Sequence, residues 1–108
     1  SDVVSLHCPL TEQTRNLMDA NALSKMKPSA VLINTARGAI VDEAALSDAL
    51  IQGKIAGAGL DVFVSEPVVG EHLTSLDNVL LSPHVGTATT ETRDEMGLRV
   101  IENIKTFL

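Results

Sequence analysis

The strongest constraint on this chain is that short apolar runs alternate with helix-like stretches from end to end. Four runs have the length and composition of buried strands, at residues 2–6, 30–34, 55–62 and 78–81. Runs of this length rich in Val, Ile and Leu favour strands, and regular alternation with helices implies that the strands are parallel. We therefore predict one α/β unit with about four parallel strands.

The segments between these runs carry helix signals. Asp19 is placed to cap a helix that reaches Met26, and Asp42 is placed to cap a second helix that Gly53 ends. A long helix is expected from about Thr90, with one apolar stripe made of Met96, Val100, Ile101, Ile104 and Leu108. The small residues 57–59 predict that a helix or a ligand backbone approaches the third strand closely.

Composition excludes several classes of function. The net charge is −6 and the basic residues are dispersed, which argues against a nucleic-acid partner and, more weakly, against an anionic membrane surface. No apolar run approaches the roughly 20 residues of a membrane span. The single cysteine, Cys8, cannot form an internal disulfide, so a cytoplasmic location is expected. Three scattered histidines lack zinc-ligand spacing, and we expect no metal site.

Four functional side chains follow the ends of the predicted strands. Arg37 follows the second strand, Asp61 ends the third, Glu66 lies in the loop after it, and His84 follows the fourth. In parallel sheets the loops at the carboxyl ends of the strands form the ligand site. We therefore expect these four side chains to meet at one edge of the sheet.

The segments that carry these residues resemble the D-isomer-specific 2-hydroxyacid dehydrogenases. The resemblance rests on ordered motifs: Leu-His-Cys-Pro-Leu-Thr at 6–11, Asn-Thr-Ala-Arg-Gly at 34–38, Gly-Leu-Asp-Val-Phe at 59–63 with Glu-Pro at 66–67, and Ser-Pro-His-Val-Gly at 82–86. It covers essentially the whole chain. It implies the second half of a Rossmann-type, doubly wound, parallel NAD(P)-binding domain.

The resemblance also implies catalytic roles for Arg37, Glu66 and His84. Arg37 would bind the substrate carboxylate through its planar fork and help to polarise the carbonyl. His84 would also contact the substrate, as general acid in reduction and general base in oxidation, which suits a side chain that titrates near neutral pH. Glu66 would pair with His84 and orient its ring.

A nicotinamide cofactor, NAD or NADP, is implied in the same way. The family positions that line its cleft correspond to Cys8, Pro9, Thr35, Ala36, Arg37, Asp61, His84, Val85, Gly86 and Thr87. Asp61 would lie near the nicotinamide end; its alternative role is to hydrogen-bond the following turn. A thiol nucleophile at Cys8 activated by His7 is disfavoured, because adjacent strand residues point to opposite faces.

Parts of a complete dehydrogenase are missing from these residues. There is no Gly-x-Gly-x-x-Gly loop to hold a pyrophosphate, so we expect residues 1–108 to be a partial domain that lacks the first nucleotide-binding half and the substrate domain. The strand at residues 2–6 would then be an open edge, which favours pairing with a second copy and a homodimer. The isolated chain is not expected to be a working enzyme.

Within the family, residues 86–96 most resemble the glyoxylate and hydroxypyruvate reductases. The expected reaction is hydride transfer between NAD(P)H and a small 2-oxo acid, which gives the D-2-hydroxy acid. A non-catalytic relative, such as a corepressor or dinucleotide sensor, is the alternative that the sequence leaves open. The presence of Arg37, Glu66 and His84 together favours the enzyme.

Overall fold

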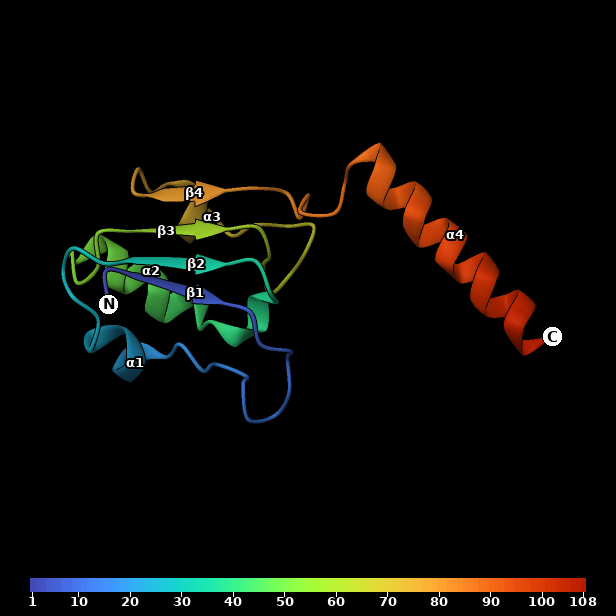
Figure 1. Cartoon of the computed structure of the whole chain (residues 1–108). Coiled ribbons are helices and arrows are strands. Elements are labelled where there is room, and N and C mark those ends of the chain that lie inside the picture. The colour runs from blue at the N-terminus through green and yellow to red at the C-terminus, as the bar shows by residue number, and fades with distance from the viewer.

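The computed structural model describes residues 1–108 and contains one four-stranded sheet. The strands lie in the order β1 (Val3–Leu6), β2 (Val31–Asn34), β3 (Gly57–Leu60) and β4 (Val79–Leu81), and each neighbouring pair is parallel (Figure 1). The predicted α/β fold with parallel strands is therefore confirmed. β1 and β4 are the two edges of the sheet.

The helices begin where the sequence places their caps. Asp19 accepts a hydrogen bond from the backbone N–H of Ala22 and starts α1 (Ala20–Ser24), and Asp42 does the same for Ala45 at the start of α2 (Glu43–Ile51). Gly53 follows α2 with φ of +64°, the left-handed conformation that ends many helices. Two short elements, η1 (Gly38–Ile40) and α3 (Glu71–Thr74), have no signal in the periodicity because they are too short.

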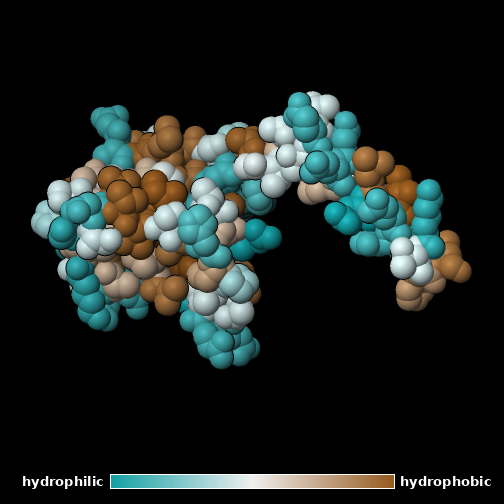
Figure 2. Space-filling view, in the orientation of Figure 1, coloured by the Kyte–Doolittle hydropathy of each residue, from teal (hydrophilic) through white to brown (hydrophobic).

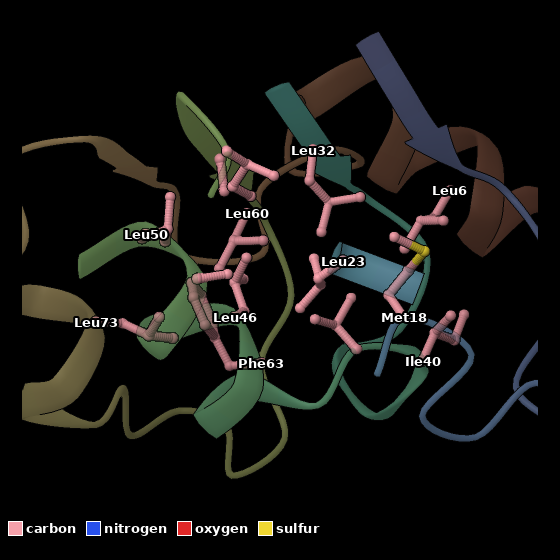
Figure 3. Packing of buried hydrophobic residues seen from close by; sticks show 14 residues of the cluster. Leu6, Met18, Leu23, Leu32, Ile40, Leu46, Leu50, Leu60, Phe63 and Leu73 are labelled. Carbon is pink, nitrogen blue, oxygen red and sulfur yellow. The ribbon is translucent and has the colours of Figure 1, made fainter. Parts of the chain in front are cut away.

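The hydrophobic core lies between one face of the sheet and the helices α1, α2 and α3 (Figure 3). Leu32 and Ala58 occupy one register row of the sheet, and Leu60 lies in the row beside Asn34; all four are buried. Leu23 of α1, Leu46 of α2 and Leu73 of α3 close the core from the other side.

The opposite face of the sheet has no helix over it. Ser5, Ile33, Gly59 and Leu80 form one row on this face, and Leu80 is 75% exposed. Apolar side chains consequently remain on the surface of the sheet body (Figure 2). We call this surface the open face.

The long helix α4 (Thr90–Phe107) extends away from the sheet (Figure 1). The predicted helix and its apolar stripe are present, but none of its residues is buried and Met96, Val100, Ile101 and Ile104 are each at least half exposed. None of the helices combines the length and the apolarity that crossing a bilayer requires.

Three details differ from the sequence prediction. α1 stops at Ser24, before Met26, because the last turn already closes with hydrogen bonds to carbonyls three residues back. The strand within residues 55–62 contains only Gly57–Leu60. Its glycines do admit a close protein neighbour, which is not a helix: a Cβ on Gly57 would lie 2.9 Å from the carbonyl oxygen of Asn78, and one on Gly59 would lie 3.0 Å from Cδ1 of Ile33.

Candidate functional site

Two hollows lie side by side at the carboxyl ends of the strands. One, with a volume of about 530 Å³, is lined by Thr35, Arg37, Asp61, Ser82, His84, Val85, Gly86 and Thr87. The other is lined by His7, Cys8, Pro9, Leu10, Thr35, Ala36 and Arg37. Thr35 and Arg37 belong to both, so the hollows form one continuous edge. All ten positions expected at the cofactor line it, and pockets for small ligands have volumes of roughly 300–1,000 Å³.

Glu66 and His84 form a direct pair in which Nδ1 of the imidazole lies 2.7 Å from Oε2 of the carboxylate. The other carboxylate oxygen, Oε1, accepts a hydrogen bond of 2.9 Å from the backbone N–H of Phe63. The hydrogen bond from His84, followed by that from Phe63, holds the pKa of Glu66 below its ordinary value, so the carboxylate is ionised near neutral pH. An ionised carboxylate can only accept, so Nδ1 carries a proton and Nε2 is left for a ligand.

Asp61 uses both of its oxygens to hold the loop that carries His84. Oδ1 accepts from the N–H of Val85 and Oδ2 from the N–H of Gly86, each at 3.0 Å. The hydrogen bond from Val85 is the main reason why the pKa of Asp61 is lowered, and hydrogen bonds from Ser82 and Gly86 add to it. His84 itself has φ of +57°, an uncommon conformation for a residue with a side chain, and the Asp61 contacts lie directly beside it.

Arg37 lies on a tight turn that a buried amide organises. Asn34, the last residue of β2, is 1% exposed; its Oδ1 accepts from the N–H of Ala36 at 3.1 Å, and its Nδ2 donates to the carbonyl of Arg37 at 3.0 Å. The guanidinium is exposed and donates to the carbonyl of Ala36. Asn34 therefore shapes the turn on which Thr35, Ala36 and Arg37 meet the hollows, a role that the motif alone did not reveal.

Gly38 brings the Arg37 turn against the loop that carries Glu66. A Cβ at this buried position would overlap the backbone carbonyl of Phe63 and lie 2.5 Å from the backbone nitrogen of Val64. Only glycine allows the two loops to approach this closely. The position of Gly38 directly after a candidate site residue was the available sequence signal.

The remaining histidines and the cysteine have ordinary surroundings. His7 lies 2.8 Å from the hydroxyl of Ser5 through its Nε2, and Cys8 is half-buried against the core as a free thiol. His72 lies 3.8 Å from Glu43. No group of three or more His, Cys, Asp or Glu side chains is arranged to hold a metal ion.

Comparison with known proteins identifies the family of the chain that carries this site. The family model described as D-isomer specific 2-hydroxyacid dehydrogenase, NAD binding domain, matches residues 1–86. The chain belongs to this family. Both the Arg37 turn and the Glu66–His84 pair lie within the matched residues.

The relatives that the chain matches include proteins named glyoxylate reductase and hydroxypyruvate reductase. The glyoxylate reductase of Thermococcus litoralis is 52% identical over 107 residues, which are 99% of this chain and 32% of that protein. The hydroxypyruvate reductase of Thermotoga maritima is 45% identical, over 96% of this chain and 35% of that protein. The chain therefore spans about a third of the length of the relatives that it matches.

A solved structure extends the likeness to the whole fold. The NADPH-dependent glyoxylate/hydroxypyruvate reductase of Sinorhizobium meliloti, in complex with NADP and malonate, matches with a TM-score of 0.95 and 48% identity. The match covers 98% of this chain and 33% of the solved one. Coverage of this extent includes α4, so the position of α4 away from the sheet is shared.

Proposed function

We propose that this chain supplies the catalytic residues of an NAD(P)-dependent reductase that converts a small 2-oxo acid, similar to glyoxylate or hydroxypyruvate, into the D-2-hydroxy acid. The observation that carries the proposal is the Glu66–His84 pair at 2.7 Å, on the same sheet edge as Arg37. The names of the relatives support the same class of substrate.

His84 is the proposed proton donor during reduction. With Nδ1 bonded to Glu66, the imidazolium releases its other proton, from Nε2, to the carbonyl oxygen of the substrate as this becomes a hydroxyl. Glu66, through its bond to Nδ1, holds the ring in the orientation from which Nε2 makes this transfer. In the reverse direction the neutral ring accepts the same proton.

Arg37 is the proposed site for the substrate carboxylate. Its guanidinium is exposed at the border of the two hollows and is bonded only to the carbonyl next to it, so its remaining N–H groups are free to form a bidentate contact. This contact would fix the carbonyl within reach of His84. A bound nicotinamide cofactor would supply the hydride.

The two hollows fit the nicotinamide end of such a cofactor. They offer hydroxyl groups from Thr35 and Thr87, backbone groups, and the small apolar side chains of Cys8, Pro9 and Ala36. Asp61 already accepts two N–H groups, but two carboxylate oxygens have about four acceptor positions, which leaves capacity for a carboxamide. The proposed cofactor-binding residues are thus the ten named from the motifs, from Cys8 to Thr87.

The rest of the nucleotide site is proposed to come from other parts of the protein. A first nucleotide-binding half would supply the phosphate-binding glycine loop and cover the open face, and a separate domain would close over the substrate. The share of the relatives that this chain spans, 32% in Thermococcus litoralis, supports this division.

The proposal includes a homodimer in the cytoplasm with no nucleic-acid partner. The unpaired edge of β1 and the uncovered stripe of α4 support association with a second copy. The free thiol of Cys8 suits a reducing compartment. The net charge of −6 disfavours nucleic acid.

Substitution of His84 in the full-length protein tests the proposal. His84→Gln should lower kcat with glyoxylate or hydroxypyruvate by about 10²–10⁴-fold, the usual contribution of general acid–base catalysis, without abolishing NAD(P)H binding. His72→Gln, which alters a histidine outside both hollows and outside the Glu66 pair, is the control. Near-normal turnover in His84→Gln would reject the assignment, and cofactor binding without any turnover in the unsubstituted protein would favour a dinucleotide sensor.

A further inference from the structure

Glu43 makes a long-range contact that the proposed reaction has not used. It is the first residue of α2, and its side chain is only 16% exposed. Its Oε1 accepts a hydrogen bond of 2.7 Å from the backbone N–H of Val64, which lies 21 residues further along the chain. Its Oε2 lies 3.8 Å from Nε2 of His72. Both oxygens therefore face the segment at residues 63–72, which also carries Glu66.

The contact with Val64 lies one residue from an anchor of Glu66. Phe63 donates its backbone N–H to Oε1 of Glu66, and the next N–H along the chain, that of Val64, is donated to Glu43. The Phe63 side chain is buried in the core beside Leu46 of α2 (Figure 3). The backbone of Phe63 and Val64 is thus fixed to α2 through the Val64 N–H, and it holds the Glu66 carboxylate through the Phe63 N–H.

The helix-dipole effect alone does not explain this placement. An acidic residue in the first turn of a helix stabilises it from a solvent-exposed position as well. Glu43 is instead directed into the loop, where a largely buried carboxylate must be compensated by specific hydrogen bonds. The structure therefore connects α2 to His84 through Glu43, the Phe63–Val64 backbone and Glu66.

We propose that Glu43 is a positioning residue that holds the Glu66 loop in the place from which Glu66 orients His84. This inference rests on the proposed function, since it assigns Glu43 a part in the same reaction. Without the Glu43 carboxylate, the N–H of Val64 loses its partner and the loop is free to shift. The Phe63 N–H and Glu66 then lose their fixed relation to the imidazole.

The test compares Glu43 variants of the full-length protein. Glu43→Ala removes the acceptor, and Glu43→Asp keeps the charge but is one methylene too short to reach Val64. Glu43→Gln keeps an acceptor oxygen at the same reach. We expect Ala and Asp to lower kcat about tenfold with little change in KM, the size expected for losing one hydrogen bond to a charged group, and Gln to restore most of it.

Ser47→Ala is the matched structural control. Ser47 lies one turn further along α2, is buried, and donates to the carbonyl of His72 at 2.9 Å, so it ties α2 to the far end of the same segment. Its loss should lower the melting temperature without lowering kcat. Equal losses of kcat in Ser47→Ala and Glu43→Ala would overturn the proposal, because the effect would then follow stability alone.

A second readout separates this proposal from the proposed function. The titration of the Glu66 carboxyl, followed by carbon-13 NMR, should move to higher pH in Glu43→Asp and stay in place in Glu43→Gln, because the two hydrogen bonds that lower the pKa of Glu66 depend on the loop. If the Glu66 titration moves in Glu43→Asp but the unsubstituted protein reduces no 2-oxo acid, the positioning role of Glu43 is supported and the proposed reaction is rejected. An unchanged titration in Glu43→Asp would overturn the positioning role whatever the activity.

Discussion

Gly38→Ala is expected to force apart the two loops that carry Arg37 and Glu66. The added Cβ would overlap the carbonyl of Phe63 and stand 2.5 Å from the nitrogen of Val64, whereas real Cβ contacts essentially never fall below 3.0 Å. The three nearest atoms all belong to the backbone of Phe63 and Val64, so rotation of a side chain cannot relieve the overlap.

The size of the effect follows from how firmly both loops are held. On one side, the turn is fixed by the hydrogen bonds of Asn34; on the other, residues 63 and 64 are fixed by Glu66 and Glu43. Overpacking a well-packed interior costs about 1–3 kcal/mol. Because rigid backbone must move here, we expect a loss at the upper limit, about 3 kcal/mol or more, and a melting temperature lower by roughly 6–12 °C.

Two other glycines provide controls for the same substitution in the full-length protein. A Cβ at Gly97, within α4, meets nothing within 4 Å, so Gly97→Ala should stabilise that helix by about 0.5–1 kcal/mol. Gly53 also has open space but a φ of +64°, so Gly53→Ala should cost about 1–2 kcal/mol from backbone strain alone. The three variants therefore separate close approach, helix propensity and left-handed conformation.

Thermal unfolding of the three variants, with kcat and KM for a small 2-oxo acid, provides the assay. Gly38→Ala should be the least stable and should also lose turnover, because Arg37 and the Glu66–His84 pair no longer share their geometry. A melting temperature for Gly38→Ala equal to or above that of Gly53→Ala would refute the close-approach reasoning.

Two further substitutions examine the loops around the hollows. Asp61→Asn leaves one acceptor oxygen where two N–H groups are bound, and should lower the free energy of unfolding by about 1–3 kcal/mol in urea titrations near neutral pH. The pKa of Asp61 is held below its ordinary value of 3.8, so the stabilisation that its ionised carboxylate provides is complete above pH 3.8 and is lost as the pH falls through the folded pKa. If the difference in unfolding free energy between the unsubstituted protein and Asp61→Asn persists in stronger acid, the ionised carboxylate is not its source. Asn34→Leu leaves the N–H of Ala36 without its partner, at about 1–3 kcal/mol, while the carbonyl of Arg37 keeps the hydrogen bond that it accepts from the N–H of Ile40. It should raise KM for the 2-oxo acid more than it lowers kcat, and an unchanged KM would separate Asn34 from substrate binding.

Much of the fold could be predicted because local signals and global topology agree. Asp19 and Asp42 were recognisable as caps from their place before apolar periodic stretches, and the structure shows both accepting from the third residue that follows. Parallel strands bring their carboxyl ends together, so the meeting of Arg37, Asp61 and His84 at one edge followed from the order of elements.

The role of Asp61 shows where prediction from the sequence stopped. Its motif suggested a place near the cofactor, and hydrogen bonding to a turn was the alternative. The structure shows both oxygens on the N–H groups of Val85 and Gly86, 24 and 25 residues away. Contacts over such separations depend on the paths of two loops, and periodicity carries no information about them.

The sequence by itself determined the alternation of strands and helices, the family, and the residue types at the carboxyl edge, because these depend on local preference and on ordered motifs. Only the tertiary structure decided that Glu66 binds Nδ1 of His84 and leaves Nε2 free, that Gly38 is required by the backbone at Phe63, and that Glu43 reaches Val64. It also showed that the sheet of residues 1–108 does not cover the apolar stripe of α4, although the spacing of the stripe is that of a core-facing helix. The physical reason is the same in each case: hydrogen bonds and close contacts act over a few ångströms, and the chain must fold before residues distant in sequence come within that range.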